Sequence, residues 1–190
     1  KGLQVVFEEM DDLQELNPSM VFTNLFLNNL MTIQPSDNTV PYLYNGNTYY
    51  FRQDWLDYYD TMFSRMADNG TMVCASVLLH YSDEFSFLCY PGATANSAAF
   101  YGINTSNEVG ANYLGAFVSF LSDRYDGHDP EKGMIAKWMV GNEVNDSGVY
   151  NYVGTMDRLS YMKEYCRTFR IVYNNVKRNI PKADVYLVME

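Results

Sequence analysis

The segment Ala136–Asp146 places a glutamate directly after a run of apolar residues. It reads Ala-Lys-Trp-Met-Val-Gly-Asn-Glu-Val-Asn-Asp, and the stretch Ile135–Val140 is typical of a strand buried in a parallel sheet. In folds built on parallel sheets, polar groups at the carboxyl ends of the strands face the ligand crevice. Asn142 and Glu143 are therefore candidates for direct contact with a ligand.

A strand-end glutamate suits the hydrolysis of a glycosidic bond, which needs two carboxyl groups flanking that bond. One of the two must stay protonated near neutral pH, and apolar surroundings favour the protonated form. Glu143 follows Trp138, Met139 and Val140, which is consistent with this requirement. An amide such as Asn142 can donate a hydrogen bond to the sugar 2-hydroxyl, a contact that strengthens in the transition state.

The dipeptide Asn-Glu occurs a second time, at Asn107-Glu108, before an amphipathic segment. There Asn107 or Ser106 would cap a helix, and Glu108 would interact favourably with the helix dipole. We interpret this copy as structural. Spacing alone leaves both a structural and a functional role open for Asn142-Glu143.

Other polar residues lie where predicted strands end. Asn24 ends Ser19–Asn24, and His80 and Tyr81 follow Thr71–Leu79. In a parallel barrel these side chains would point to the same face as the motif. His80 could bind a sugar hydroxyl, orient a carboxylate, or simply be a hydrogen-bonded residue at a strand end.

Two further groups of candidates depend on position only. Asn145 and Asp146 follow the motif in its loop and could line a cleft. Glu190 follows the last predicted strand, and it could be a ligand contact, a second carboxylate or an ordinary strand-end residue.

Hydrophobic periodicity predicts strands alternating with helices. The predicted strands are 19–24, 71–79, 135–140 and 184–189, and the predicted helices are 8–16, 54–69, 108–125 and 156–179. This alternation indicates a parallel sheet, either part of a (β/α)₈ TIM barrel or a small doubly wound α/β sheet. A complete barrel needs about 250 residues, so the barrel interpretation makes residues 1–190 a single, truncated domain.

The segment Tyr42–Phe51 predicts a hairpin that turns at Asn45-Gly46 between aromatic flanks. Its aromatic side chains could form a stacking wall for a sugar or pack as ordinary cross-strand pairs. In the predicted helix 156–179, we expect one apolar stripe to face the core, formed by Leu159, Met162, Cys166, Phe169, Tyr173 and Val176.

Composition narrows the function classes. The net charge of -10 argues against binding to a nucleic acid backbone, and no apolar run is long enough to span a membrane. The 17 tyrosines supply flat apolar faces with a polar handle, which suit sugars but also suit an ordinary core. Nucleotide-binding, serine-hydrolase and zincin motifs are absent from the sequence, and its two histidines are far apart, so no metal site is expected.

Trp-Met-Val-Gly-Asn-Glu-Val-Asn at 138–145 resembles the acid/base segment of clan A, the large clan of retaining (β/α)₈ glycosidases. The wider chain resembles an uncharacterised, mostly secreted bacterial family related to that clan. The matching stretches are Lys1-Gly2-Leu3-Gln4, Phe22-Thr23-Asn24-Leu25, Tyr44-Asn45-Gly46, and Asn104–Tyr125 leading to Asn142-Glu143.

This resemblance implies a glycoside hydrolase with a carbohydrate substrate, no cofactor, and a secreted or cell-surface location. It makes Glu143 the general acid/base and Asn142 the ligand of the 2-hydroxyl. The nucleophile of the clan ends strand seven, which would lie beyond residue 190, so residues 1–190 alone are expected to be inactive. In the clan Asn-Glu ends strand four, whereas here it ends the third predicted strand; a further strand could precede Lys1, lie at Leu3–Phe7 or lie within Tyr81–Thr105.

Two other functions stay open. The same face could bind carbohydrate without chemistry, as a binding module or pseudo-enzyme. A small doubly wound domain could instead serve protein interaction. The unpaired last strand would favour self-association through the sheet edge.

Overall fold

The computed structural model describes residues 2–4 and 9–189. Its strands are β1 (Gly2–Gln4), β2 (Met20–Phe26), β3 (Met31–Thr32), β4 (Thr39–Tyr44), β5 (Asn47–Arg52), β6 (Met72–Leu78), β7 (Ile135–Val140) and β8 (Asp184–Leu187). Its helices are α1 (Met10–Leu16), α2 (Leu27–Leu30), α3 (Gln53–Asp68), α4 (Glu108–Arg124) and α5 (Arg158–Asn179), with a 3-10 turn, η2, at Ser86–Leu88. The predicted alternation of strands and helices is confirmed.

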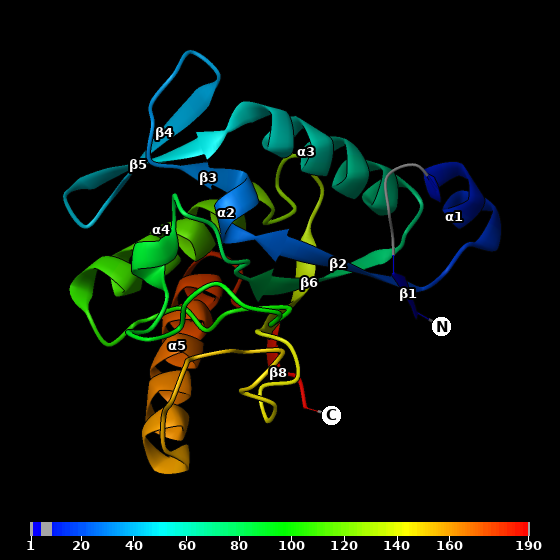
Figure 1. Cartoon of the computed structure of the whole chain (residues 1–190). Helices are drawn as coiled ribbons and strands as arrows, with labels where there is room; N and C mark the ends of the chain where they lie inside the picture. Colours follow the sequence, from blue (N-terminus) through cyan, green and yellow to red (C-terminus); the bar gives the residue numbers. More distant parts are fainter. Residues whose placement is uncertain (1, 5–8, 190) are drawn as a thin grey trace.

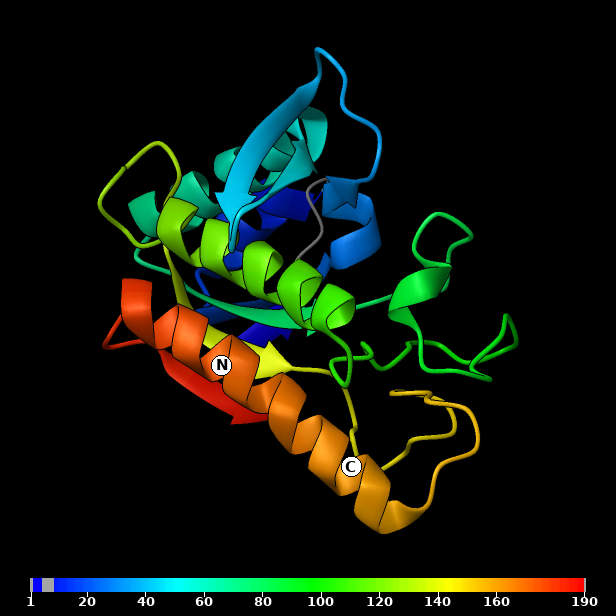
Figure 2. The same cartoon turned by 90° about the vertical axis from the view of Figure 1, so that its left-hand side faces the viewer.

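Five strands form one parallel sheet in the order β1-β2-β6-β7-β8. Their order in space is their order in the chain, as it is around a (β/α)₈ barrel, whereas a doubly wound sheet reverses its strand order at a switch point. Helices α4 and α5 pack side by side across the strands (Figure 2). The fold is therefore part of a TIM barrel, and the doubly wound alternative was wrong.

The Asn142-Glu143 pair follows the fourth strand of this sheet, not the third. The additional strand is β1, which pairs in parallel with Met20–Phe22 of β2 (Figure 1). It overlaps Leu3–Phe7, one of the ranges in which a further strand was expected, although residues 5–8 lie outside the described residues. Three residues are too few to show a strand's alternating pattern, so the sequence alone could not place it.

A second, antiparallel sheet contains the predicted hairpin, in the order β3-β5-β4. The φ angles of Asn45 and Gly46 are 48° and 80°, as a two-residue type I′ turn requires. The ring of Phe51 stacks on the ring of Phe120 in α4 with centroids 3.9 Å apart. The ring of Tyr42 contacts the Phe120 ring edge-on. These ring contacts pack the hairpin against α4, as the cross-strand and core packing alternative expected.

The core lies between the parallel sheet and its helices. Helix α3 buries the predicted stripe, which consists of Leu56, Tyr59, Met62, Phe63 and Met66. Six consecutive residues of β6, Val73–Leu78, are buried, as expected for a central strand covered on both faces. No helix in the described ranges is both long and apolar enough to cross a membrane.

The prediction for α5 was partly wrong. Val176 is buried and Phe169 packs against the core, as expected, but the other four predicted positions, Tyr173 among them, are exposed. Leu159 and Met162 are 62% and 56% exposed, and Cys166 is also exposed. The buried positions are Val172, Asn175 and Val176, and the tyrosines nearer the start of the helix also face inward. The inward side carries hydroxyl and amide groups that bond to the neighbouring elements, so a purely apolar criterion selected the wrong side in the first half of the helix.

Candidate active site

The loop after β7 contains two left-handed backbone positions. The φ angle is 74° at Gly141 and 39° at Glu143. A Cβ atom at Gly141 would lie 2.9 Å from Cγ1 of Val144, so both space and conformation favour glycine there. For a residue with a side chain, such as Glu143, the left-handed conformation costs about 1–2 kcal/mol. Strain of this kind persists only where the surroundings impose it, which is common at functional sites.

Hydrogen bonds from both neighbouring strands impose this conformation. The Gly141 amide donates to the Val77 carbonyl of β6 (3.1 Å), and the Ser76 hydroxyl donates to the Gly141 carbonyl (3.1 Å). On the other side, the Val144 amide donates to the Val188 carbonyl just after β8 (2.9 Å). The backbone on each side of the Asn142-Glu143 pair is thus fixed to the sheet.

The side chains of Asn142 and Glu143 are partly exposed. Neither the amide nor the carboxylate makes a hydrogen bond or an ion pair to another residue in the described part of the chain. Trp138, three positions before the loop, is fully buried and donates to the Ile135 carbonyl. The backbone is therefore held, while the two polar side chains stay available for a ligand.

The two loop residues that follow differ in their surroundings. Asn145 is exposed, whereas Asp146 is partly buried. The carboxylate of Asp146 accepts the Gly148 amide (3.0 Å), and its own amide donates to the Glu143 carbonyl (2.8 Å). Asp146 therefore shapes the loop, and Asn145 lies on its surface.

His80 lies two residues after the end of β6. Its ring stacks on Phe26, the last residue of β2, with centroids 4.0 Å apart, and its backbone amide donates to the Asn28 side chain (3.0 Å). Burial lowers the pKa of His80, and a hydrogen bond with the Ala99 backbone partly offsets this effect. The histidine is thus held at the carboxyl edge of the sheet with its neutral form favoured.

Phe26, Phe100 and Tyr150 form an aromatic cluster around His80 that the sequence analysis missed. Phe100 lies 5.4 Å from His80 and 6.4 Å from Tyr150, measured between ring centroids, and all four side chains are partly exposed. If the predicted strand 19–24 had been extended by two residues, its alternation would have placed Phe26 on the same face as Asn24. Phe100 and Tyr150 lie in irregular loops, where no periodic signal exists.

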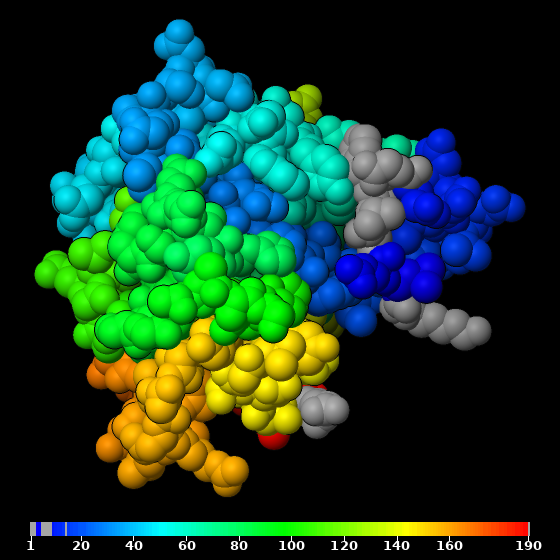
Figure 3. All heavy atoms as spheres, viewed as in Figure 1, coloured from blue at the N-terminus to red at the C-terminus, as the bar shows by residue number. Residues whose placement is uncertain are grey.

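The cluster joins the loop after β6 to the loop after β7. The amides of Ala99 and Phe100 both donate to the Val149 carbonyl (2.9 and 3.2 Å), and the Tyr152 amide donates to the Phe100 carbonyl (2.9 Å). Figure 3 shows the green and yellow atoms of these loops side by side on one face. The aromatic cluster and the Asn142-Glu143 loop therefore belong to one connected surface.

Tyr81 and Asn24 lie in different surroundings from those expected. The Tyr81 ring packs against Tyr101, with centroids 5.4 Å apart, within the loop after β6. Asn24 does not end its strand, because β2 continues to Phe26. It lies one layer below the carboxyl edge, in register with Ser76 of β6, so the prediction that Asn24 is a strand-end residue was wrong.

Glu143 is the only carboxylate among the described residues within three positions after β2, β6, β7 or β8. Glu190, the other candidate carboxylate, lies outside the described residues. No three His, Cys, Asp or Glu side chains in the described ranges are grouped so that they could hold a metal ion. The described edge thus combines one carboxyl group, the amides of Asn28, Asn29 and Asn142, one imidazole and aromatic faces, a set suited to acid/base chemistry beside a flat polar ligand.

Solved structures with a similar fold include glycoside hydrolases. A family 39 glycoside hydrolase from the gut symbiont Bacteroides cellulosilyticus WH2 has a TM-score of 0.56 at 14% identity, over 98% of this chain and 30% of its own. A family 1 β-glucosidase from Thermotoga maritima has a TM-score of 0.58 at 9% identity, over 96% of this chain and 36% of its own. Cel5A from Thermotoga maritima, solved as a mutant with cellobiose, has a TM-score of 0.54 at 11% identity, over 97% of this chain and 45% of its own.

These similarities, at 14% identity or less, establish the fold as part of a (β/α)₈ barrel. The chain spans less than half the length of each of these enzymes. No curated protein has a significantly similar sequence. One family matches the whole chain, residues 1–190: the chain belongs to DUF5722, a family of unknown function.

Proposed function

We propose that this chain forms the acid/base half of a retaining glycoside hydrolase that acts on a polysaccharide or oligosaccharide. The main support is the placement of Glu143 directly after the fourth parallel strand, in a left-handed conformation that hydrogen bonds from β6 and the end of β8 impose. In this proposal Glu143 is the general acid/base, and Asn142 binds the sugar 2-hydroxyl.

The reaction has two steps. In the first, protonated Glu143 gives its proton to the glycosidic oxygen while a second carboxylate attacks the anomeric carbon, so that the bond to the leaving group breaks and a glycosyl ester forms. In the second, the Glu143 carboxylate takes a proton from a water molecule whose oxygen attacks the same carbon and releases the second carboxylate. The nucleophile is proposed to come from residues after 190.

The aromatic cluster fits the same substrate class. Phe26, Phe100 and Tyr150 present partly exposed rings, and the ring faces of aromatic side chains suit the apolar faces of sugars. The neutral form of His80 is favoured, so its ring can donate a hydrogen bond to a sugar hydroxyl group or accept one from it. An extracellular location, where polymeric glycans are found, is part of this proposal.

The test uses the parent protein, which we define as the chain that continues after residue 190 to include the proposed nucleophile. It measures reducing-sugar release from a panel of glycans by this protein and by its Glu143→Gln variant. We expect kcat to fall at least about a hundredfold, because the variant has no proton to give or take. The loss should be smaller for substrates with activated leaving groups, since these need little protonation. Glu108→Gln is the matched control, because it changes the other Asn-Glu pair and should leave kcat unchanged.

The outcomes separate the alternatives. Equal activity of the parent and Glu143→Gln, with both folded by circular dichroism, would show that Glu143 is not the acid/base. Glycan binding without cleavage by the parent would instead support the non-catalytic alternative, a carbohydrate-binding module or pseudo-enzyme.

We also propose that residues 1–190 self-associate when they are alone. Strands β1 and β8 are the two edges of the parallel sheet in the described part of the chain, and unpaired edges are templates for pairing. Sedimentation velocity should show dimers or larger species whose fraction rises with concentration; a monomer at all concentrations would contradict this.

A further inference from the structure

Two tyrosine hydroxyl groups of α5 hold the backbone on either side of Glu143. Tyr165 donates to the carbonyl of Val140, the last residue of β7, over 2.8 Å. Tyr161 donates to the carbonyl of Val144, over 2.6 Å. The two accepting carbonyls bracket the three loop residues 141–143, so one helix fixes both ends of the segment that carries the proposed acid/base.

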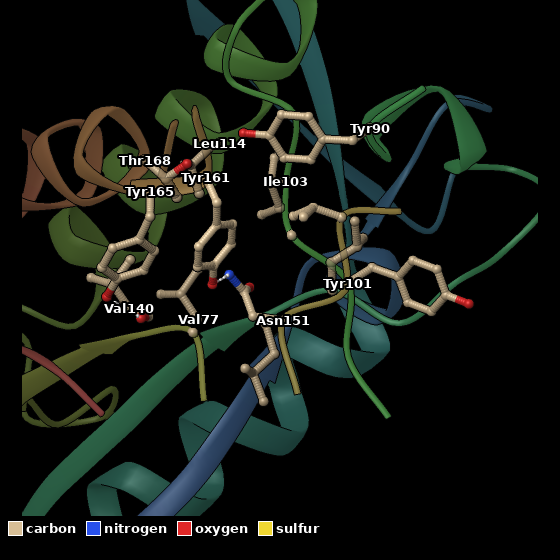
Figure 4. Close-up of a pocket in the computed structure, with 15 residues that line it drawn as sticks. Val77, Tyr90, Tyr101, Ile103, Leu114, Val140, Asn151, Tyr161, Tyr165 and Thr168 are labelled. Atoms are coloured by element: carbon tan, nitrogen blue, oxygen red, sulfur yellow. Dashed lines mark hydrogen bonds between the residues drawn. The ribbon is translucent and has the colours of Figure 1, made fainter. Parts of the chain in front are cut away.

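A third side chain determines the direction of the Tyr161 hydroxyl group. The amide of Asn151 donates to the Tyr161 oxygen over 2.6 Å (Figure 4). Because that oxygen accepts this bond, its single hydrogen is directed to the Val144 carbonyl. Asn151 is only 9% exposed and Val144 only 6%, so both ends of the chain from Asn151 through Tyr161 to Val144 are buried.

The surroundings keep both hydroxyl groups protonated. Tyr161, Tyr165 and Asn151 line a small cavity of about 30 Å³ behind the loop, together with Val140 and Gly141 (Figure 4). Burial raises the pKa of Tyr161, with a smaller increase from the negative charge of Asp146 and a decrease from the Asn151 hydrogen bond. Burial also raises the pKa of Tyr165. Both groups therefore remain hydrogen-bond donors over the whole neutral pH range.

We propose that Tyr161 and Tyr165, supported by Asn151, are positioning residues that hold the carboxyl group of Glu143 where it can reach the glycosidic oxygen. The inference rests on the proposed function of Glu143. Its physical basis is that the left-handed conformation at Glu143 is unfavourable by itself, so it needs restraint at both ends. Without the two bonds, the segment can relax toward an ordinary backbone conformation and carry the carboxyl group away from the reacting atoms.

The test compares Tyr161→Phe, Tyr165→Phe and the double variant in the parent protein. Phenylalanine keeps the ring and removes only the donor, so the core packing is preserved. A misplacement of about 1 Å can cost roughly a hundredfold in rate, and we expect kcat to fall about 10- to 100-fold with little change in KM. Tyr173→Phe is the matched control, since Tyr173 lies on the exposed side of the same helix and should leave kcat unchanged.

A second comparison separates positioning from a general loss of structure. In a Glu143→Gln background, Tyr161→Phe should cause no further loss, because the group it positions is gone. A loss of equal size in both backgrounds would overturn the inference. So would wild-type kcat in all three phenylalanine variants while Glu143→Gln is inactive, and that result would leave the proposed function intact.

A further measurement does not depend on catalytic activity. It tests the positioning role even if the parent protein cleaves no glycan and the proposed function fails. Amide hydrogen exchange of the parent protein by NMR reports on the loop directly. The Val144 amide donates to the Val188 carbonyl and the Asp146 amide donates to the Glu143 carbonyl. Exchange at both amides should accelerate at least about tenfold in Tyr161→Phe, because the loop opens more readily without the Tyr161 hydrogen bond. Unchanged exchange at both amides would overturn the positioning role whatever the outcome for activity.

Discussion

The imidazole ring of His80 lies against the phenyl ring of Phe26, with 4.0 Å between the ring centroids and 29° between the ring planes. The contact joins the chain after β6 to the last residue of β2, so it connects two strand ends at the edge that carries Glu143. Because burial disfavours the imidazolium form, this packing makes the fold sensitive to acid.

The two histidines of the chain should affect stability in opposite directions with pH. Burial lowers the pKa of His80, whereas a hydrogen bond with Asp126 raises the pKa of exposed His128. In the unfolded chain both titrate near pH 6.5. The contribution of His80 to the free energy of unfolding is therefore present above about pH 6.5, and it is lost as the pH falls through the lowered pKa of the folded state. The contribution of His128 to the free energy of unfolding is present below about pH 6.5, and it is lost as the pH rises through the raised pKa of the folded state.

Urea unfolding between pH 5 and 8 measures both effects. Relative to the wild type, His80→Phe should lose less stability on acidification, and His128→Asn should lose less stability as the pH rises. Slopes identical to the wild type in both variants would contradict these assignments.

Glu143→Asn should stabilise the protein while removing the proposed activity. Asparagine tolerates the left-handed conformation better than glutamate, so the free energy of unfolding should rise by about 0.5–1 kcal/mol. Glu131→Asn is the control, because Glu131 is an exposed turn residue without a positive φ angle, and its effect should stay within about 0.5 kcal/mol. Destabilisation by Glu143→Asn would mean that the conformation carries no strain.

Gly110→Ala should destabilise the protein even though alanine favours helices. A Cβ atom at this position would lie 1.9 Å from the Asn104 carbonyl oxygen, which belongs to the loop that leads into α4. The loop must shift, at a cost of about 1–3 kcal/mol. Gly148→Ala is a suitable reference, since its Cβ would meet only the Asp146 side chain at 3.3 Å. A rise in the melting temperature of Gly110→Ala would contradict the close approach.

Thiol labelling should distinguish one cysteine from the other two. Cys166 is exposed, whereas Cys74 and Cys89 are buried. Burial raises the pKa of Cys89 to about 11 and also raises that of Cys74, so their thiolate fractions are small at neutral pH. An aromatic disulfide reagent should modify one thiol per native chain quickly and three after unfolding, and Cys166→Ser should abolish the fast phase. A fast phase that survives in Cys166→Ser would place a different thiol at the surface.

Much of the fold followed from local patterns. The apolar run before Asn142, the stripe from Leu56 to Met66 and the Asn45-Gly46 turn each predicted the element that forms. Asn107 caps α4 as expected, since its side chain accepts the Gly110 amide over 2.9 Å. These features depend on the conformation of a few neighbouring residues, which is why sequence alone identified them.

Other features depend on which elements meet. The sequence could not show which side of α5 packs inward, since an apolar stripe with Cys166 competed with one that carries Tyr161 and Tyr165. Nor could it bring Phe100 and Tyr150 beside His80, because residues from irregular loops meet only when the sheet sets the loops side by side. The sequence by itself determined the alternation of strands and helices and the position of Glu143 after a buried strand. The tertiary structure alone decided the strained conformation of Glu143 and its restraint from α5, because hydrogen bonds between elements far apart in the chain impose both.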